Sequence, residues 1–86
     1  MFSKRFSCDV RFTHHAIQRM RQRNISEDLL LDLIESGDVK YKDETHMWIF
    51  KAFADRQDNL ICVAAVLEPV LVIKTVMHHF ELEDLL

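Results

Sequence analysis

The sequence predicts a single α+β domain over residues 1–86, with two N-terminal helices packed on a four-stranded antiparallel sheet and a short C-terminal tail. The 86 residues leave room for only one domain. Apolar residues follow a helical period up to Gly37, and beyond it they form runs rich in β-branched and aromatic residues. The breaks between those runs are short, and parallel strands would need longer connections, so the sheet should be an antiparallel meander.

The first helix is predicted over residues 14–23, because Thr13 is a good N-cap residue and strong helix formers follow it. Asn24 accepts the left-handed conformation that ends many helices. Ser26 then supplies the N-cap of a second helix over Glu27–Ser36, whose leucine stripe should face the core. Gly37 is expected to stop this helix as its C′ residue.

Strands are predicted at residues 39–42, 46–54, 60–67 and 70–77, with turns at 43–44, 55–59 and 68–69. The run 60–67 is apolar on both faces, which indicates the centre of the sheet. Trp48 is expected in the core. Aromatic and aliphatic residues of the other strands supply more apolar surface than one sheet face needs. Either the amphipathic tail 80–86 covers the second face or two copies of the chain form a homodimer.

Composition and charge narrow the function classes. With 49% hydrophobic residues and one glycine and one proline, the chain is neither disordered nor fibrous. Residues 1–24 carry a local charge of +5, whereas residues 25–86 carry −8. The pI of about 5.9 differs from the values above about 9 that are typical of nucleic-acid-binding domains. A positive segment can attract an anion locally, and the alternative is that the opposite charges neutralise each other within the fold.

The two cysteines, Cys8 and Cys62, are not spaced for a disulfide framework or a zinc site, so we expect free thiols in a reducing cytoplasm. No run approaches the roughly 20 apolar residues of a membrane span, and the start lacks the apolar stretch of a signal peptide. A cytoplasmic protein without a membrane partner follows as the expectation.

The first predicted helix carries a polar stripe. His15, Arg19 and Arg23 recur at i, i+4 and i+8 and therefore share one edge of the helix. Two like charges four residues apart repel each other, so we expect an anion beside them. A structural ion pair with Asp43, Glu44 or the second helix would supply it, and so would a phosphate group.

Residues 13–26 run Thr-His-His-Ala-Ile-Gln-Arg-Met-Arg-Gln-Arg-Asn-Ile-Ser. Together with Gly37 and a late Val-Ile-Lys-Thr-Val run, they resemble an uncharacterised family of small bacterial domains with the signature H-A-x-x-R-x-x-x-R-G-I-S. The resemblance covers about residues 11–76, and Asn24 stands where the signature has Gly. The family has no assigned activity. Its helix-helix-sheet order is similar to that of RelE/ParE-type toxins of toxin–antitoxin pairs, many of which cleave messenger RNA. Those toxins are generally basic, whereas this chain is acidic.

The resemblance implies RNA cleavage as one candidate function, and the chain contains residue types for it. His15 and either His78 or His79 could act as general acid and base, because imidazole transfers protons in both directions near neutral pH. Arg19 and Arg23 could hold the phosphate. This chemistry needs no cofactor and no metal, and the histidine pairs are not spaced to chelate one. The alternative is a non-catalytic interaction module, whose arginine stripe is structural or docks an acidic partner such as an antitoxin helix.

Overall fold

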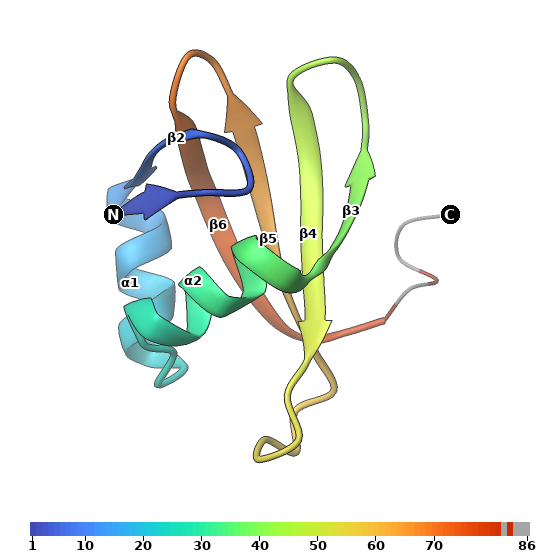
Figure 1. Ribbon diagram of the computed structural model, residues 1–86. Helices are drawn as coiled ribbons and strands as arrows, with labels where there is room; N and C mark the ends of the chain where they lie inside the picture. Colours follow the sequence, from blue (N-terminus) through green and yellow to red (C-terminus); the bar gives the residue numbers. More distant parts are fainter. Residues whose placement is uncertain (82, 84–86) are drawn as a thin grey trace.

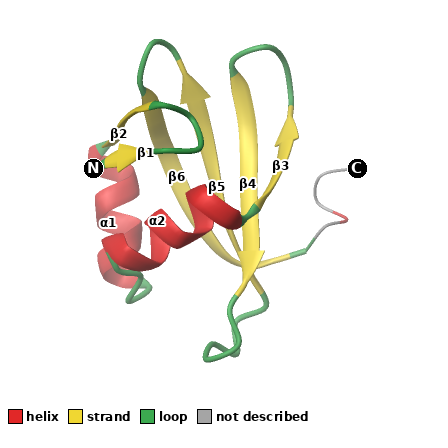
Figure 2. Cartoon of the chain, in the orientation of Figure 1, coloured by secondary structure: helices red, strands yellow, loops and turns green. Residues whose placement is uncertain are grey.

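Eight elements follow one another in a computed structural model that describes residues 1–81 and 83. They are β1 (Phe2–Ser3), β2 (Cys8–Phe12), α1 (His14–Gln22), α2 (Glu27–Ser36), β3 (Asp38–Tyr41), β4 (His46–Ala52), β5 (Leu60–Leu67) and β6 (Leu71–Phe80). The strands form one sheet in the order β1-β2-β6-β5-β4-β3 (Figure 1). Helix α1 packs on β6 and helix α2 packs on β4, so that both helices cover the same sheet face (Figure 2).

The predicted α+β class and the two helices are confirmed, but the predicted sheet and element order are wrong. The sheet has six strands instead of four, and two of them precede the helices. It is also mixed, because β2 lies parallel to β6 with Val10 opposite Leu71 and Phe12 opposite Ile73. The segment 8–12 is too short to show a clear period, and its partner lies some 60 residues later. Strand β5, between β6 and β4, is central as predicted.

The helix boundaries follow local signals. The Thr13 hydroxyl accepts a hydrogen bond from the Ala16 N–H at 3.1 Å, and the Ser26 hydroxyl accepts one from the Leu29 N–H at 3.1 Å, so both predicted N-caps are confirmed. Helix α1 ends one residue earlier than predicted, and Asn24 has the expected left-handed conformation with φ of 52°.

Gly37 ends α2 for a different reason from the one predicted. Its backbone is extended, with φ of −74° and ψ of 170°, so no left-handed turn requires a glycine here. A Cβ atom at this position would lie 2.5 Å from the Leu33 carbonyl oxygen and 2.8 Å from the Phe50 carbonyl oxygen. The glycine is needed because the end of α2 approaches the backbone of β4 closely.

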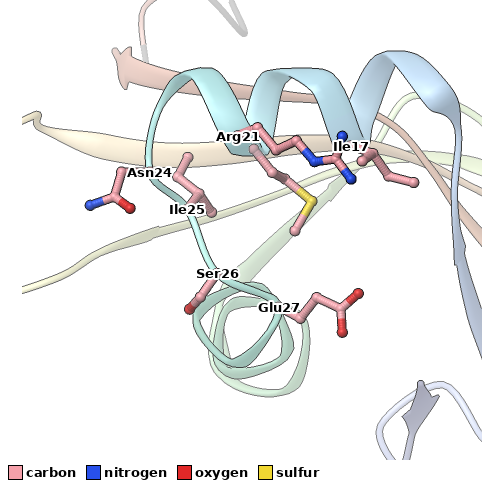
Figure 3. Close-up of a pocket in the computed structure, with 7 residues that line it drawn as sticks. Ile17, Arg21, Asn24, Ile25, Ser26 and Glu27 are labelled. Carbon is pink, nitrogen blue, oxygen red and sulfur yellow. The ribbon is translucent and has the colours of Figure 1, made fainter.

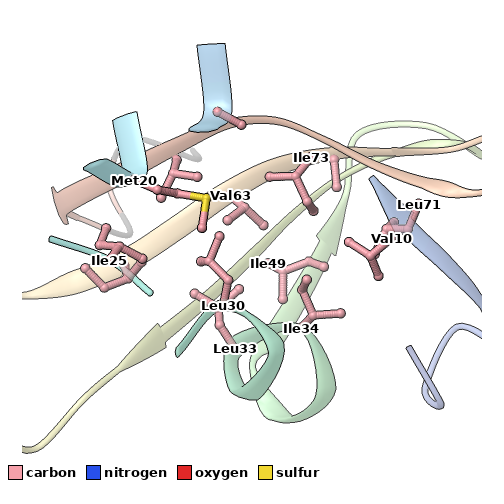
Figure 4. Close-up of a cluster of buried hydrophobic side chains, with 14 of the residues drawn as sticks. Val10, Met20, Ile25, Leu30, Leu33, Ile34, Ile49, Val63, Leu71 and Ile73 are labelled. Atoms are coloured by element: carbon pink, nitrogen blue, oxygen red, sulfur yellow. The ribbon is translucent and has the colours of Figure 1, made fainter. Parts of the chain in front are cut away.

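The core lies between the two helices and one face of the sheet (Figure 4). Leu30, Leu33 and Ile34 of α2 are completely buried, and they face buried residues of the central strands such as Ile49 and Val63. Burying each such side chain contributes about 2 kcal/mol to stability. The remaining members of the core cluster are Val10, Ala16, Met20, Ile25, Met47, Ile61, Ala65, Leu71, Ile73 and Val76.

The other sheet face is also largely apolar. Met47 and Ile49 point into the core, and side chains alternate along a strand, so Trp48 and Phe50 project from the opposite face. Both are half-buried, and the prediction that Trp48 lies in the core is therefore wrong. The predicted tail began at residue 80, but Phe80 is the buried last residue of β6, so the strand extends further than predicted. Residues 82 and 84–86 of the predicted tail lie outside the described residues. Within residues 1–81 and 83, no helix is long and apolar enough to cross a membrane.

Candidate functional site

The arginine stripe of α1 has no carboxylate partner among residues 1–81 and 83. Arg19 donates from Nη1 to the Gln22 side-chain oxygen at 3.0 Å, and Arg23 donates from Nη1 to the Val76 carbonyl oxygen at 2.5 Å. Asp43, one expected partner, instead accepts from the His46 ring at 2.9 Å. The expected ion pair with Asp43, Glu44 or α2 is therefore wrong, and the stripe retains guanidinium donors for an external anion.

The Arg56 side chain connects the loop between β4 and β5 to the C-terminal end of α1. This guanidinium donates to the Arg23 carbonyl oxygen at 3.1 Å and to the Asn24 carbonyl oxygen at 3.0 Å. Carbonyl oxygens at a helix C-terminus lack intrahelical partners and carry partial negative charge, so a cation is favourable at this position. Arg56 also binds Asp58 through two bonds, Nε to Oδ1 at 2.9 Å and Nη2 to Oδ2 at 2.7 Å.

Asp58 in turn contacts His78 at the end of β6. The distance from Asp58 Oδ2 to His78 Nδ1 is 3.1 Å. An ionised carboxylate only accepts hydrogen bonds, so this contact assigns a proton to Nδ1 and leaves Nε2 of a neutral ring as a proton acceptor. The His78 side chain is 31% exposed to solvent, whereas the Asp58 side chain is 13% exposed. Solvent and a ligand can therefore reach the imidazole while the carboxylate stays partly shielded.

The same region contains a bulge that places two imidazoles side by side. Leu60 pairs with Phe80 and Cys62 with Met77, so His78 and His79 together face a single residue of β5. His79 has a positive φ of 51°, and its N–H donates to the Asp58 carbonyl oxygen at 2.8 Å. The two ring centroids are 4.6 Å apart, with the planes tilted by 50°.

The charge of Asp58 is well defined. The bonds from Arg56 hold the pKa of this carboxyl well below its usual range, and the bond from His78 acts in the same direction against the opposing effect of burial. Asp58 correspondingly raises the pKa of the Arg56 guanidinium. Both groups are thus ionised at neutral pH, and a fixed negative charge lies beside the His78 ring.

The structure brings together some of the predicted site residues and separates others. Arg23 binds the carbonyl oxygen of the residue two positions before His78, so Arg23, His78 and His79 share one end of the molecule. His15 is exposed near the other end of α1, about 12 Å from Arg23 along the helix axis, and Arg19 lies between them.

Sequence reasoning missed Arg56 and Asp58 altogether, because the cluster 55–59 has the composition of an ordinary turn. The one available signal was an arginine between two aspartates in a loop, a pattern that permits a local ion pair. Nothing in that pattern indicates which histidine the second aspartate contacts.

A cleft lies elsewhere, between the end of α1 and the start of α2 (Figure 3). It has a volume of about 390 Å³, and its lining includes no histidine. Ile17, Met20 and Ile25 supply apolar surface, while Arg21 and Glu27 contribute charge. This cleft offers surface for docking without an acid–base pair for catalysis. The other lining residues are Asn24 and Ser26.

Comparison with known proteins gives one match. Residues 12–78 match the family described as "Domain of unknown function (DUF4258)". No curated protein and no solved structure matches the chain. The matched range contains the arginine stripe, Arg56, Asp58 and His78, and it stops one residue before His79.

Proposed function

Since the chain belongs to the DUF4258 family, whose description assigns no activity, we propose a function from the site itself: a metal-independent ribonuclease of the RelE-like toxin kind. The observation that carries the proposal is the Asp58–His78 pair beside Arg23 at the end of α1. It combines an oriented imidazole with a cation that can bind phosphate.

The proposed reaction is transesterification of single-stranded RNA. His78 Nε2 takes the proton from a ribose 2′-hydroxyl, and the resulting oxygen attacks the adjacent phosphorus. The bond from phosphorus to the 5′-oxygen breaks, and His79 in its protonated form donates a proton to that oxygen. The products are a 2′,3′-cyclic phosphate and a free 5′-hydroxyl.

Charge on the phosphate grows during this reaction, and the guanidinium groups of Arg23 and Arg19 are suited to stabilise it. Asp58 keeps the His78 ring oriented through its contact with Nδ1. The positive segment 1–24 supports phosphate binding on a chain of net charge −3. His15, about 12 Å along α1 from Arg23, contacts a neighbouring nucleotide in this proposal.

The test is cleavage of an end-labelled single-stranded RNA by the purified chain, with and without a chelator. Replacement His78→Ala should reduce the cleavage rate by about 10²–10⁴-fold, the usual contribution of an acid–base group. Arg21→Ala is the matched control, because Arg21 is exposed on the same helix outside the stripe. An inactive but folded wild-type chain, or equal cleavage by His78→Ala, contradicts the proposal.

The toxin aspect is tested separately in growing cells. Induction of the wild-type chain in bacteria should arrest growth and fragment RNA, and induction of His78→Ala or Arg19→Ala should not. Unaffected growth with soluble wild-type protein counts against a toxin, although cleavage in the purified assay would still support a ribonuclease.

The second candidate function is a non-catalytic interaction module, and the cleft between α1 and α2 favours it (Figure 3). Its apolar floor and Arg21 suit an acidic amphipathic helix, such as that of an antitoxin. This candidate predicts that Ile17→Asp abolishes binding of such a helix while leaving RNA cleavage unchanged. Measured binding that is insensitive to Ile17→Asp argues against the cleft as the docking site.

A further inference from the structure

A second pocket lies on the sheet face away from the helices, and neither the family nor the proposed ribonuclease site accounts for it. It has a volume of about 130 Å³. Trp48 of β4 and the small Ala64 of β5 form part of its wall, and Lys42 and Lys74 line it as well. Its remaining lining residues are His46, Met47, Ala65 and Val66.

The strand register explains why the indole is accessible. Trp48 of β4 lies directly opposite Ala64 of β5, and Ala64 lies opposite Thr75 of β6. The positions next to Trp48 on these two neighbouring strands are therefore both occupied by small residues. The face of the indole is consequently not covered by a large neighbour on β5. Trp48 remains only half-buried although it sits on an interior strand.

A second bulge brings a cation to the same place. The β5–β6 register shifts between Ala64 and Ala65, which pair with Thr75 and Ile73, so Lys74 is the extra residue. The bulged Lys74 lines the pocket from the β6 side, and Lys42 lines it from the β3–β4 side. Arg11, opposite Val72 in the register, alternates with core residues of β2 and projects from this same face.

Lys42 and Lys74 of this pocket and Arg11 on the same sheet face are not neutralised within the part of the chain that the structure describes. Neither Lys42, Lys74 nor Arg11 forms an ion pair with a residue in 1–81 or with residue 83. Asp43, the carboxylate next to Lys42, accepts bonds from Thr45 and His46 instead. An aromatic ring flanked by unpaired ammonium groups is suited to a planar base with phosphates on either side.

We propose that the Trp48 pocket binds a nucleotide of single-stranded RNA, with the base stacked on the indole and the phosphates held by Lys42 and Lys74. A nucleobase suits the ring because stacking requires only an exposed aromatic face and tolerates every base. The choice of RNA rests on the proposed function. The Trp48 pocket lies on the sheet face opposite α1, so it would hold part of the RNA substrate at a distance from His78.

A second copy of the chain is the competing occupant of this face. A twofold-symmetric interface places the same patch of both copies together. Such an interface would bring the cations of the two copies close to one another and remove them from water, which is unfavourable without carboxylate partners. The unpaired cations of this face therefore favour a polyanion over a homodimer.

The experiment uses the single tryptophan of the chain as its reporter. The full chain carrying His78→Ala, which should not cleave RNA, is titrated with a short oligouridylate while Trp48 fluorescence is recorded. We expect saturable quenching and an affinity that falls as salt rises. Lys42→Ala/Lys74→Ala should weaken binding at least tenfold. The matched control is Lys4→Ala, which should leave binding unchanged because Lys4 is an exposed lysine in the turn after β1, at the opposite side of the sheet from β4.

A second measurement keeps the proposal testable if the double variant fails to fold. Anisotropy of labelled RNA should show binding weakened about fivefold or more by Trp48→Leu, with most of the affinity restored by Trp48→Phe, because a phenyl ring also stacks on a base. No quenching at millimolar oligouridylate, or equal binding by Trp48→Leu, overturns the proposal. A dimer in light scattering that dissociates with Trp48→Asp also overturns it and assigns the face to a second copy.

The two proposals fail in different ways. Quenching of Trp48 by RNA in a wild-type chain that does not cleave RNA supports the pocket and rejects the ribonuclease. Cleavage that depends on His78 without any change in Trp48 fluorescence supports the ribonuclease and rejects the pocket.

Discussion

Replacement Arg56→Ala should destabilise the protein strongly, because this side chain fastens the β4–β5 loop to the end of α1. It makes four hydrogen bonds, two to the Asp58 carboxylate and two to the carbonyl oxygens of Arg23 and Asn24. The replacement leaves Asp58 with His78 as its remaining side-chain partner, and it leaves the two carbonyl groups at the helix end without this cation.

The expected magnitude follows from the burial of the pair. Breaking a fully buried ion pair costs about 3–5 kcal/mol. Arg56 and Asp58 retain 19% and 13% of their side-chain exposure, so water compensates in part. A loss of about 2–3 kcal/mol results, which for a domain of this size lowers the melting temperature by roughly 10–20 °C.

Thermal unfolding followed by circular dichroism measures this effect. Arg19→Ala is the matched control, because Arg19 bonds only to Gln22 on the helix surface and its loss should change stability by less than about 0.5 kcal/mol. A melting temperature for Arg56→Ala within about 3 °C of the wild type would show that Arg56 does not fasten the loop to the helix. So would a double variant Arg56→Ala/Asp58→Ala whose loss equals the sum of the two single losses.

Three further outcomes are expected. Gly37→Ala should reduce the unfolding free energy by roughly 1–3 kcal/mol and thereby lower the denaturant midpoint, because its Cβ would lie under 3 Å from two backbone carbonyl oxygens. An unchanged midpoint would show that the chain relaxes there freely. Because the pKa of Asp58 is lowered in the folded chain, its ionised carboxylate stabilises the fold at pH values above the usual pKa of 3.8. This stabilisation is lost as the pH falls below 3.8 toward the lowered pKa. Unfolding free energies from about pH 6 down to pH 3 should therefore fall more steeply for the wild type than for Asp58→Asn, and parallel curves would contradict the assignment. Burial raises the pKa of the Cys62 thiol to about 12, so iodoacetamide should modify Cys8 first in the folded chain, and equal rates measured by mass spectrometry would exclude a protected Cys62.

Helical spacing predicts one part of the candidate site but not the contacts that complete it. The polar stripe of α1 could be predicted because helical spacing places His15, Arg19 and Arg23 on one edge of the helix, whatever the rest of the fold. The closeness of Arg23 to His78 depends on α1 lying along β6, which no local spacing encodes. The ion pair that orients His78 depends on Arg56, a loop residue whose side chain reaches the end of α1, and the stripe alone does not indicate it.

Several local elements of this protein could be predicted from short stretches of sequence. The caps at Thr13 and Ser26, the left-handed Asn24 and the central strand 60–67 all depend on residues within a few positions of one another. Such interactions are nearly independent of the distant chain, so composition and period are sufficient to predict them.

Contacts between distant segments could not be predicted in this way and are known from the fold. Strand β2 pairs in parallel with β6, and Arg56 of a loop between strands holds the end of α1. Many other pairings of these segments would satisfy the same local preferences. The choice among the pairings depends on packing the whole core around Leu30, Leu33 and Ile34. The catalytic geometry proposed for His78 arises from that global choice, whereas its residue types were already present in the sequence.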